Sequence, residues 1–109
     1  MITIDDFAKI EMRVGLVEEA TNKEGSEKLL RLVVNFGDEV GKRIIFTAVR
    51  PYGYTPDYFQ GKKFLFLTNL EYKKIMDEES QGMILATDSD NGPVFLSPGD
   101  DSPIGAKVR

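Results

Sequence analysis

The sequence predicts a single all-β domain, built as a small five-stranded Greek-key barrel with short helices. Three observations support this prediction. Apolar and polar residues alternate in several short segments, turn-forming residues recur about every ten residues, and one helical turn separates the third and fourth expected strands. With 109 residues and 41% hydrophobic content, the chain can form one modest core. The domain is therefore expected to span residues 1–109.

The chain is expected to begin with a short helix and a half-buried strand. Thr3 is suited to cap the helix, and Asp6 occupies the capping-box position three residues later. This helix is expected to last about two turns. From Ile10 onward apolar residues alternate, which predicts a strand over residues 10–16, and the segment TNKEGSEK at 21–28 then predicts a loop.

The second and third strands are expected to pair as a hairpin. Apolar side chains occupy every other position of LLRLVVNF at 29–36, namely Leu30, Leu32, Val34 and Phe36. Arg31 lies on the opposite face of this strand. GDEVG at 37–41 supplies the turn, and the β-branched segment KRIIFTAV at 42–49 supplies the third strand.

A helical turn, a fourth strand and a second hairpin complete the expected barrel. The helical turn is predicted in TPDYFQG at 55–61, because proline favours the first helical position and glycine ends the helix. The strand KKFLFLTNL at 62–70 follows. Asn91-Gly92 is the strongest short hairpin signal in the chain, and it separates QGMILATD at 81–88 from PVFLS at 93–97.

The composition argues against catalysis. The chain has no cysteine and no histidine, so it lacks a thiol nucleophile, a thiolate zinc site and the usual general base near neutral pH. The acids occur as neighbouring pairs typical of solvated turns and surfaces: Asp5-Asp6, Glu18-Glu19, Glu78-Glu79 and Asp100-Asp101. We therefore expect a protein that is not an enzyme and that needs no cofactor or metal.

The protein is expected to be soluble and cytoplasmic. No apolar run approaches the roughly 20 residues that span a bilayer. The N-terminus MITIDDFAK has acids where a signal peptide would have a basic and then an apolar stretch.

Charge is distributed unevenly along the chain. The formal net charge is −4, yet residues 28–74 carry nine basic and four acidic side chains, for a net charge of +5. The segments on either side are acidic. This asymmetry indicates an anionic partner met by one face of the protein, whereas its plain alternative is a set of lysines scattered over solvated strands.

The positive segment coincides with the second and third expected strands. In the five-stranded oligonucleotide-binding (OB) barrel, ligands bind the face formed by strands two and three and the neighbouring loops. An OB-fold that binds RNA or DNA on this face is therefore the favoured interpretation.

Five segments of the chain resemble a known family. They are DDFAKIEMRVG at 5–15, GSEKLLRLVVNFGDE at 25–39, GKKFLFLTNL at 61–70, ESQGMILA at 79–86 and PIGAKV at 103–108. In this order they resemble the tRNA-binding domain family, which includes the C-terminal domain of bacterial methionyl-tRNA synthetase, beta-subunit-like proteins, and free-standing tRNA-binding and CsaA-type proteins. The resemblance spans nearly the whole chain.

The resemblance implies an OB-fold that recognises folded tRNA, with an appended N-terminal helix and C-terminal arm. It also implies a homodimer, to which these two segments contribute, and a possible aminoacyl-tRNA synthetase partner. Because the chain starts at Met1 and ends just after GAKV, we expect a free-standing module. The alternative function within the same resemblance is a CsaA-like dimer that binds peptides and has no primary RNA role.

Eight residues are predicted to contact tRNA: Lys28, Arg31, Asn69, Lys73, Lys74, Ser80, Gln81 and Met83. Lysine and arginine side chains suit phosphates, and an arginine also stacks on bases. Asn69 offers a donor and an acceptor to a base edge, or merely ends a strand. Periodicity alone makes Ser80-Gln81-Gly82-Met83 a strand entry with a core methionine, whereas the resemblance places this motif on the RNA-binding side.

Two departures from the family pattern bear on this prediction. The bulky segment Phe46-Thr47-Ala48 stands where many family members have smaller residues. It is expected to alter the floor of the site. Asp77 and Glu78 add negative charge just before the Ser-Gln-Gly-Met motif. Acids there are expected to weaken RNA binding, because they repel phosphates.

Overall fold

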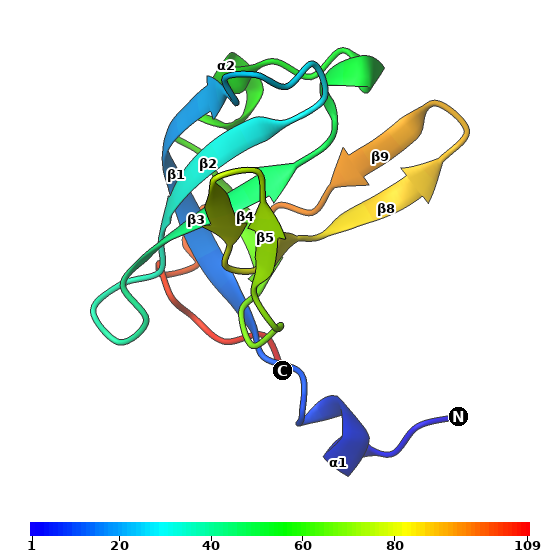
Figure 1. Cartoon of the computed structure of the whole chain (residues 1–109). Coiled ribbons are helices and arrows are strands. Elements are labelled where there is room, and N and C mark those ends of the chain that lie inside the picture. Colours follow the sequence, from blue (N-terminus) through cyan, green and yellow to red (C-terminus); the bar gives the residue numbers. More distant parts are fainter.

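The computed structural model describes residues 1–109 and shows a nearly closed antiparallel barrel of five strands (Figure 1). The predicted OB-fold is confirmed, since the strand order β3-β2-β1-β4-β7 is that of the five-stranded Greek-key barrel. The elements are α1 (Ile4–Phe7), β1 (Met12–Asn22), β2 (Leu30–Asn35), β3 (Lys42–Thr47), a 3-10 turn (Arg50–Tyr52), α2 (Pro56–Phe59), β4 (Lys63–Leu67), β5 (Lys73–Ile75), β6 (Glu78–Ser80), β7 (Met83–Ile84), β8 (Ala86–Ser89) and β9 (Gly92–Phe95).

The alternation predicted for β2 is confirmed and forms the centre of the core. Leu30, Leu32 and Val34 have no exposed surface, while Arg31 lies on the other face of the strand. The strand pairs antiparallel with β3, so that Arg31 stands opposite Phe46 on the outer face of the barrel. The predicted hairpin is therefore present, and its outer face is the one on which OB-folds bind ligands.

β1 is longer than predicted, because it pairs with two neighbouring strands. Its first half pairs with β4 and its second half with β2, and the register shifts between Val17 and Glu19. Such a bulge bends a strand, which lets β1 continue around the barrel to Asn22. Gly15 is needed at the crossing, since a Cβ atom there would lie 2.5 Å from the Val34 side chain.

Aromatic side chains fill the end of the barrel near α2. Phe59, Phe64 and Phe95 form a buried cluster with ring centroids 5.0–6.2 Å apart, and Tyr54 packs against its edge. The Tyr54 hydroxyl donates a hydrogen bond to the Pro93 carbonyl at 2.5 Å, and burial raises the pKa of this phenol. The tyrosine therefore packs within the protein.

The predicted terminal appendages are present. α1 has the capping box of Thr3 and Asp6, but it lasts a single turn and projects away from the barrel (Figure 1). The C-terminal arm runs beside β1, where the Val14 amide donates to the Ala106 carbonyl at 2.9 Å and the Val108 amide to the Met12 carbonyl at 2.8 Å. The two termini therefore extend the same end of the barrel.

Two hairpins lie outside the five-stranded sheet. The β8–β9 hairpin was predicted, but its turn residues are Asp90 and Asn91, because Ser89 pairs with Gly92. The β5–β6 hairpin was not predicted. It lies between β4 and β7, turns at Met76 with φ of 55°, and packs over β3. No helix of this structure has the length and apolar character required to cross a membrane.

Candidate nucleic-acid interface

A groove of about 260 Å³ opens between the β5–β6 hairpin and the ends of β2 and β3. Its walls are mainly apolar and are formed by Leu29, Phe46, Ala48, Leu70, Ile75 and Met83. Lys73, Ser80 and Glu71 supply the polar atoms. The groove therefore brings together three of the eight predicted tRNA contacts on the face that OB-folds use for ligands.

Met83 lies at the rim of this groove and not in the core. Its side chain is 45% exposed, whereas the next residue, Ile84, is 7% exposed and faces the barrel interior. Gly82 positions the methionine. Its φ is 155°, and a Cβ atom there would lie 2.8 Å from the Leu67 carbonyl, so only glycine fits this close approach of two backbones.

Ser80 and Gln81 close the barrel between β3 and β7. The Phe46 amide donates to the Ser80 hydroxyl at 3.1 Å, and the Ile44 amide donates to the Gln81 side-chain oxygen at 2.8 Å. The Gln81 amide in turn donates to the Ile44 carbonyl at 2.8 Å. These polar groups therefore complete the sheet, a role that the sequence did not reveal.

The three predicted lysines are exposed. Lys73 and Lys74 lie on β5, and Lys28 lies in the loop between β1 and β2. None of their ammonium groups takes part in an ion pair within the chain. All three charges are therefore available to an external anion.

Unlike these lysines, Arg31 forms an ion pair with an acid of the β5–β6 hairpin. Its Nε and Nη2 donate to the two carboxylate oxygens of Glu78 at distances of 3.0–3.1 Å. Lys23 Nζ contacts the same carboxylate at 2.8 Å and Asp77 at 2.7 Å. The hydrogen bonds from Arg31 and then from Lys23 lower the pKa of Glu78, and the bond from Lys23 lowers the pKa of Asp77.

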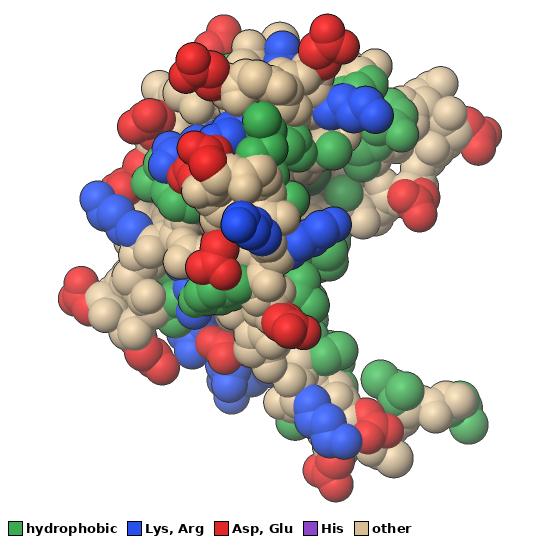
Figure 2. All heavy atoms as spheres, viewed as in Figure 1, with side chains coloured by type: hydrophobic (Ala, Val, Ile, Leu, Met, Phe, Trp, Pro, Cys, Tyr) green, Lys and Arg blue, Asp and Glu red, His purple; other side chains and the backbone are tan.

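This ion cluster balances the negative charge of the two acids. Asp77 and Glu78 were expected to leave unbalanced negative charge beside the site, but the two cations Lys23 and Arg31 neutralise them. Figure 2 shows basic and acidic side chains interspersed over this face of the molecule. Lys23 was not singled out in the sequence, because its acidic partners are more than 50 residues away and only the fold brings them together.

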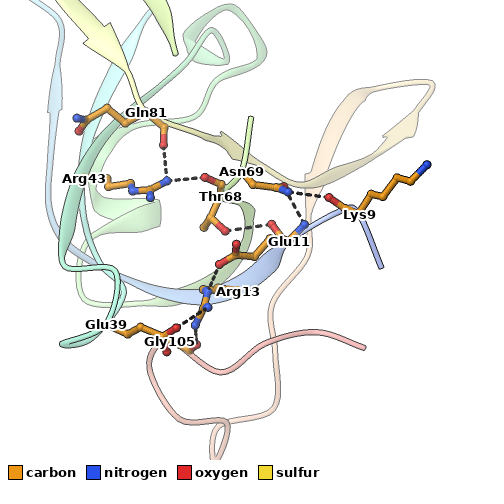
Figure 3. A network of polar contacts seen from close by, with 9 residues as sticks. All are labelled: Lys9, Glu11, Arg13, Glu39, Arg43, Thr68, Asn69, Gln81 and Gly105. Carbon is orange, nitrogen blue, oxygen red and sulfur yellow. Dashed lines mark hydrogen bonds and ion pairs between the residues drawn. The ribbon is translucent and has the colours of Figure 1, made fainter. Parts of the chain in front are cut away.

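Asn69 links the end of β4 to the N-terminal segment (Figure 3). Its side-chain oxygen accepts from the Glu11 amide at 2.8 Å, and its side-chain nitrogen donates to the Lys9 carbonyl at 2.7 Å. Arg43 joins the same region, since it donates to the Thr68 carbonyl at 2.5 Å and to the Gln81 carbonyl at 3.2 Å. Both functional groups of Asn69 are therefore used inside the chain.

A second apolar groove, of about 370 Å³, lies between α1 and the C-terminal arm. Its walls include Ile4, Phe7, Ile10 and Val108, with Lys107 and Arg109 beside them. The α1 segment also exposes Ile2 and Ile4, whose exposed fractions are 69% and 78%. Exposed apolar side chains that cluster in this way are typical of an interaction surface.

Comparisons with known proteins agree with this architecture. The family model described as "Putative tRNA binding domain" matches residues 12–107. Methionine–tRNA ligase of Methanococcus aeolicus is 43% identical over 108 residues, which make up 99% of this chain and 16% of that protein. The chain thus spans a small fraction of the length of the synthetases that it matches.

Two solved structures have the same fold over the full chain. The MetRS-related protein from Pyrococcus horikoshii superposes with a TM-score of 0.91 at 35% identity, covering 100% of this chain and 98% of that one. The CsaA chaperone protein from Picrophilus torridus superposes with a TM-score of 0.89 at 29% identity, covering both chains completely.

Proposed function

The chain belongs to the tRNA-binding domain family, and from this premise we propose that it binds folded tRNA as a non-catalytic module. The observation that carries the proposal is the apolar groove on the β2–β3 face, which has exposed lysines beside it. An apolar groove suits the face of an unpaired base, and lysines suit the phosphates around it.

Seven of the eight predicted residues have a direct role in this proposal, while the eighth, Arg31, is paired with Glu78. Lys28, Lys73 and Lys74 contact phosphates, because their charges are free and exposed. Met83 lays its thioether against a base at the groove rim. Ser80 and Gln81 hold the groove wall in place. The Ser80 hydroxyl is used inside the chain, by the Phe46 amide and the Gly82 carbonyl, whereas the Gln81 side-chain nitrogen is left for sugar or base. Asn69 acts at the edge of this surface, where it orients the N-terminal segment.

We further propose that two copies associate through α1 and the C-terminal arm. Ile4 of α1 and the preceding Ile2 suit the apolar groove of a second copy, and Asp5 and Asp6 complement Lys107 and Arg109 in charge. The module would act in the cytoplasm and deliver tRNA to an aminoacyl-tRNA synthetase. Light scattering after gel filtration tests the dimer, and a monomer at micromolar concentration would contradict it.

Binding of total tRNA as a function of salt tests the main proposal. Affinity should fall with rising salt, because phosphate contacts release counterions with a slope of roughly 0.7–0.9 per contact. Lys73→Glu and Lys28→Glu should weaken binding and reduce the slope. Lys62→Glu is the matched control, since this exposed lysine lies just before β4, outside the groove. Absence of binding at low salt would refute the proposal.

The second candidate function is a CsaA-like module that binds unfolded peptides. It is favoured by the apolar groove beside α1 and by the likeness to the CsaA chaperone structure. An assay with a fluorescent unfolded peptide separates the two functions. Peptide binding without tRNA binding at low salt would replace the first proposal with this one.

A further inference from the structure

The carboxylate of Glu78 holds two cations from distant parts of the chain. Arg31 of β2 donates to both of its oxygens at 3.0–3.1 Å, and Lys23 of the β1–β2 loop contacts one oxygen at 2.8 Å. A guanidinium paired through two parallel hydrogen bonds to a carboxylate has the geometry with which arginine also binds phosphate. Glu78 therefore binds the Arg31 guanidinium with the geometry that a phosphate would use.

The two cations differ in how far solvent reaches them. The Lys23 side chain is 8% exposed and lies over the Phe46 ring, with Nζ 5.6 Å from the ring centroid. The Arg31 side chain is 29% exposed and that of Glu78 is 27% exposed. An external anion can therefore approach Arg31, while Lys23 anchors Glu78 from the interior.

We propose that Glu78 is an internal competitor for Arg31 and thereby limits the affinity of this face for RNA phosphate. The inference rests on the proposed tRNA-binding function. When a tRNA phosphate takes the Arg31 guanidinium, Glu78 keeps its contact with Lys23, which also retains Asp77 at 2.7 Å. The exchange replaces one carboxylate by one phosphate at Arg31 and leaves no buried charge unpaired.

A purely structural role for Glu78 makes the opposite prediction. The ion cluster joins β6 to β2 and to the β1–β2 loop. The turn of the β5–β6 hairpin meets the same loop, where the Met76 side chain lies beside Gly25. If the cluster only maintained the shape of the site, removing the carboxylate would favour tRNA binding no more than removing any other negative charge from β6. A larger gain is expected only if Glu78 competes with the ligand for Arg31.

Glu78→Gln, compared with Glu79→Gln, tests the inference. Both variants remove one negative charge from β6, but Glu79 is exposed and makes no ion pair. At equal salt, Glu78→Gln should bind total tRNA several-fold more tightly than Glu79→Gln, with a salt slope steeper by roughly 0.7–0.9. In an Arg31→Gln background this gain should disappear. Equal or weaker binding by Glu78→Gln would overturn the inference.

A measurement on the unchanged protein decides the matter even if Glu78→Gln fails to fold. The side-chain Nε–H signal of Arg31, identified by its loss in Arg31→Lys, should shift when total tRNA is added in an NMR titration. An unchanged signal at saturating tRNA would overturn the inference while leaving the proposed function intact. If neither the unchanged protein nor Glu78→Gln binds tRNA at low salt, the proposed function fails and the inference fails with it.

Discussion

Gln81 pairs with Ile44 twice, once through its backbone and once through its side chain. The Gln81 amide donates to the Ile44 carbonyl at 2.8 Å, and the Ile44 amide donates to the Gln81 side-chain oxygen at 2.8 Å. The side chain thus supplies the acceptor that a neighbouring strand would normally provide. One residue thereby links β3 to the segment before β7 and helps to close the barrel.

Replacing Gln81 by leucine should destabilise the protein by about 1–2 kcal/mol, because the Ile44 amide loses its acceptor. Gln81→Glu is the matched control, since a carboxylate oxygen still accepts this hydrogen bond. Urea unfolding followed by circular dichroism measures both variants. Equal stability of the leucine variant and the unchanged protein would show that the side-chain bond does not contribute to barrel closure.

Local sequence signals predicted the parts of the fold that depend on neighbouring residues. The capping box of Thr3 and Asp6, the alternation around Leu32 and the hairpin near Asn91 all rest on short-range chemistry. The β5–β6 hairpin was missed, because its strands have three residues each and its turn residue Met76 gives no turn signal. Its formation depends on packing over β3.

The position of the Ser-Gln-Gly-Met motif in the fold was predicted, but its hydrogen-bond partners were not. The motif around Met83 was placed correctly beside the β2–β3 face, and Met83 is exposed there. The partners of Ser80 and Asn69 could not be predicted, because Phe46 lies 34 residues from Ser80 and Lys9 lies 60 residues from Asn69. Contacts over such distances follow from barrel closure and leave no periodic pattern.

Asn69→Ala should loosen the N-terminal segment without unfolding the barrel. The variant removes both side-chain hydrogen bonds of Asn69, to Lys9 and Glu11, while the two bonds from Thr68 to the Glu11 carbonyl remain. Hydrogen exchange should therefore speed up in residues 1–11, while the amides of β2 stay protected. Asn91→Ala is the control, since this exposed asparagine lies in the β8–β9 turn. Unchanged exchange in residues 1–11 would contradict this role of Asn69.

The ion cluster should make stability depend on pH in the acidic range. The pKa of Glu78 in the folded protein is lowered from its ordinary value of 4.5, first by Arg31 and then by Lys23. Its stabilising contribution is thus complete above pH 4.5 and is lost as the pH falls through the lowered pKa, because the unfolded chain takes up the proton first.

Acid titration of the unfolding free energy checks this dependence. Glu78→Gln should lose less stability than the unchanged protein between about pH 6 and about pH 3, since its amide takes up no proton. Glu79→Gln should follow the unchanged protein, because Glu79 makes no ion pair. Parallel curves for the unchanged protein and Glu78→Gln would show that the ionised Glu78 carboxylate adds no stability.

Met83→Ala should weaken tRNA binding and leave stability nearly unchanged. The side chain is 45% exposed, so its removal strips the groove rim without opening a cavity in the core. We expect about fivefold weaker binding, from the loss of roughly 1 kcal/mol of contact with a base. The change in unfolding free energy should stay within about 0.5 kcal/mol, as is usual for surface positions.

Two further variants separate a base contact at Met83 from a general effect of surface truncation. Val94→Ala removes a side chain that is 50% exposed on β9, outside the groove, and should leave tRNA affinity unchanged. Met83→Leu keeps most of the apolar surface and should bind nearly as well as the unchanged protein. If Met83→Ala binds tRNA normally, the base does not rest on this side chain, and the lysines alone must account for the affinity.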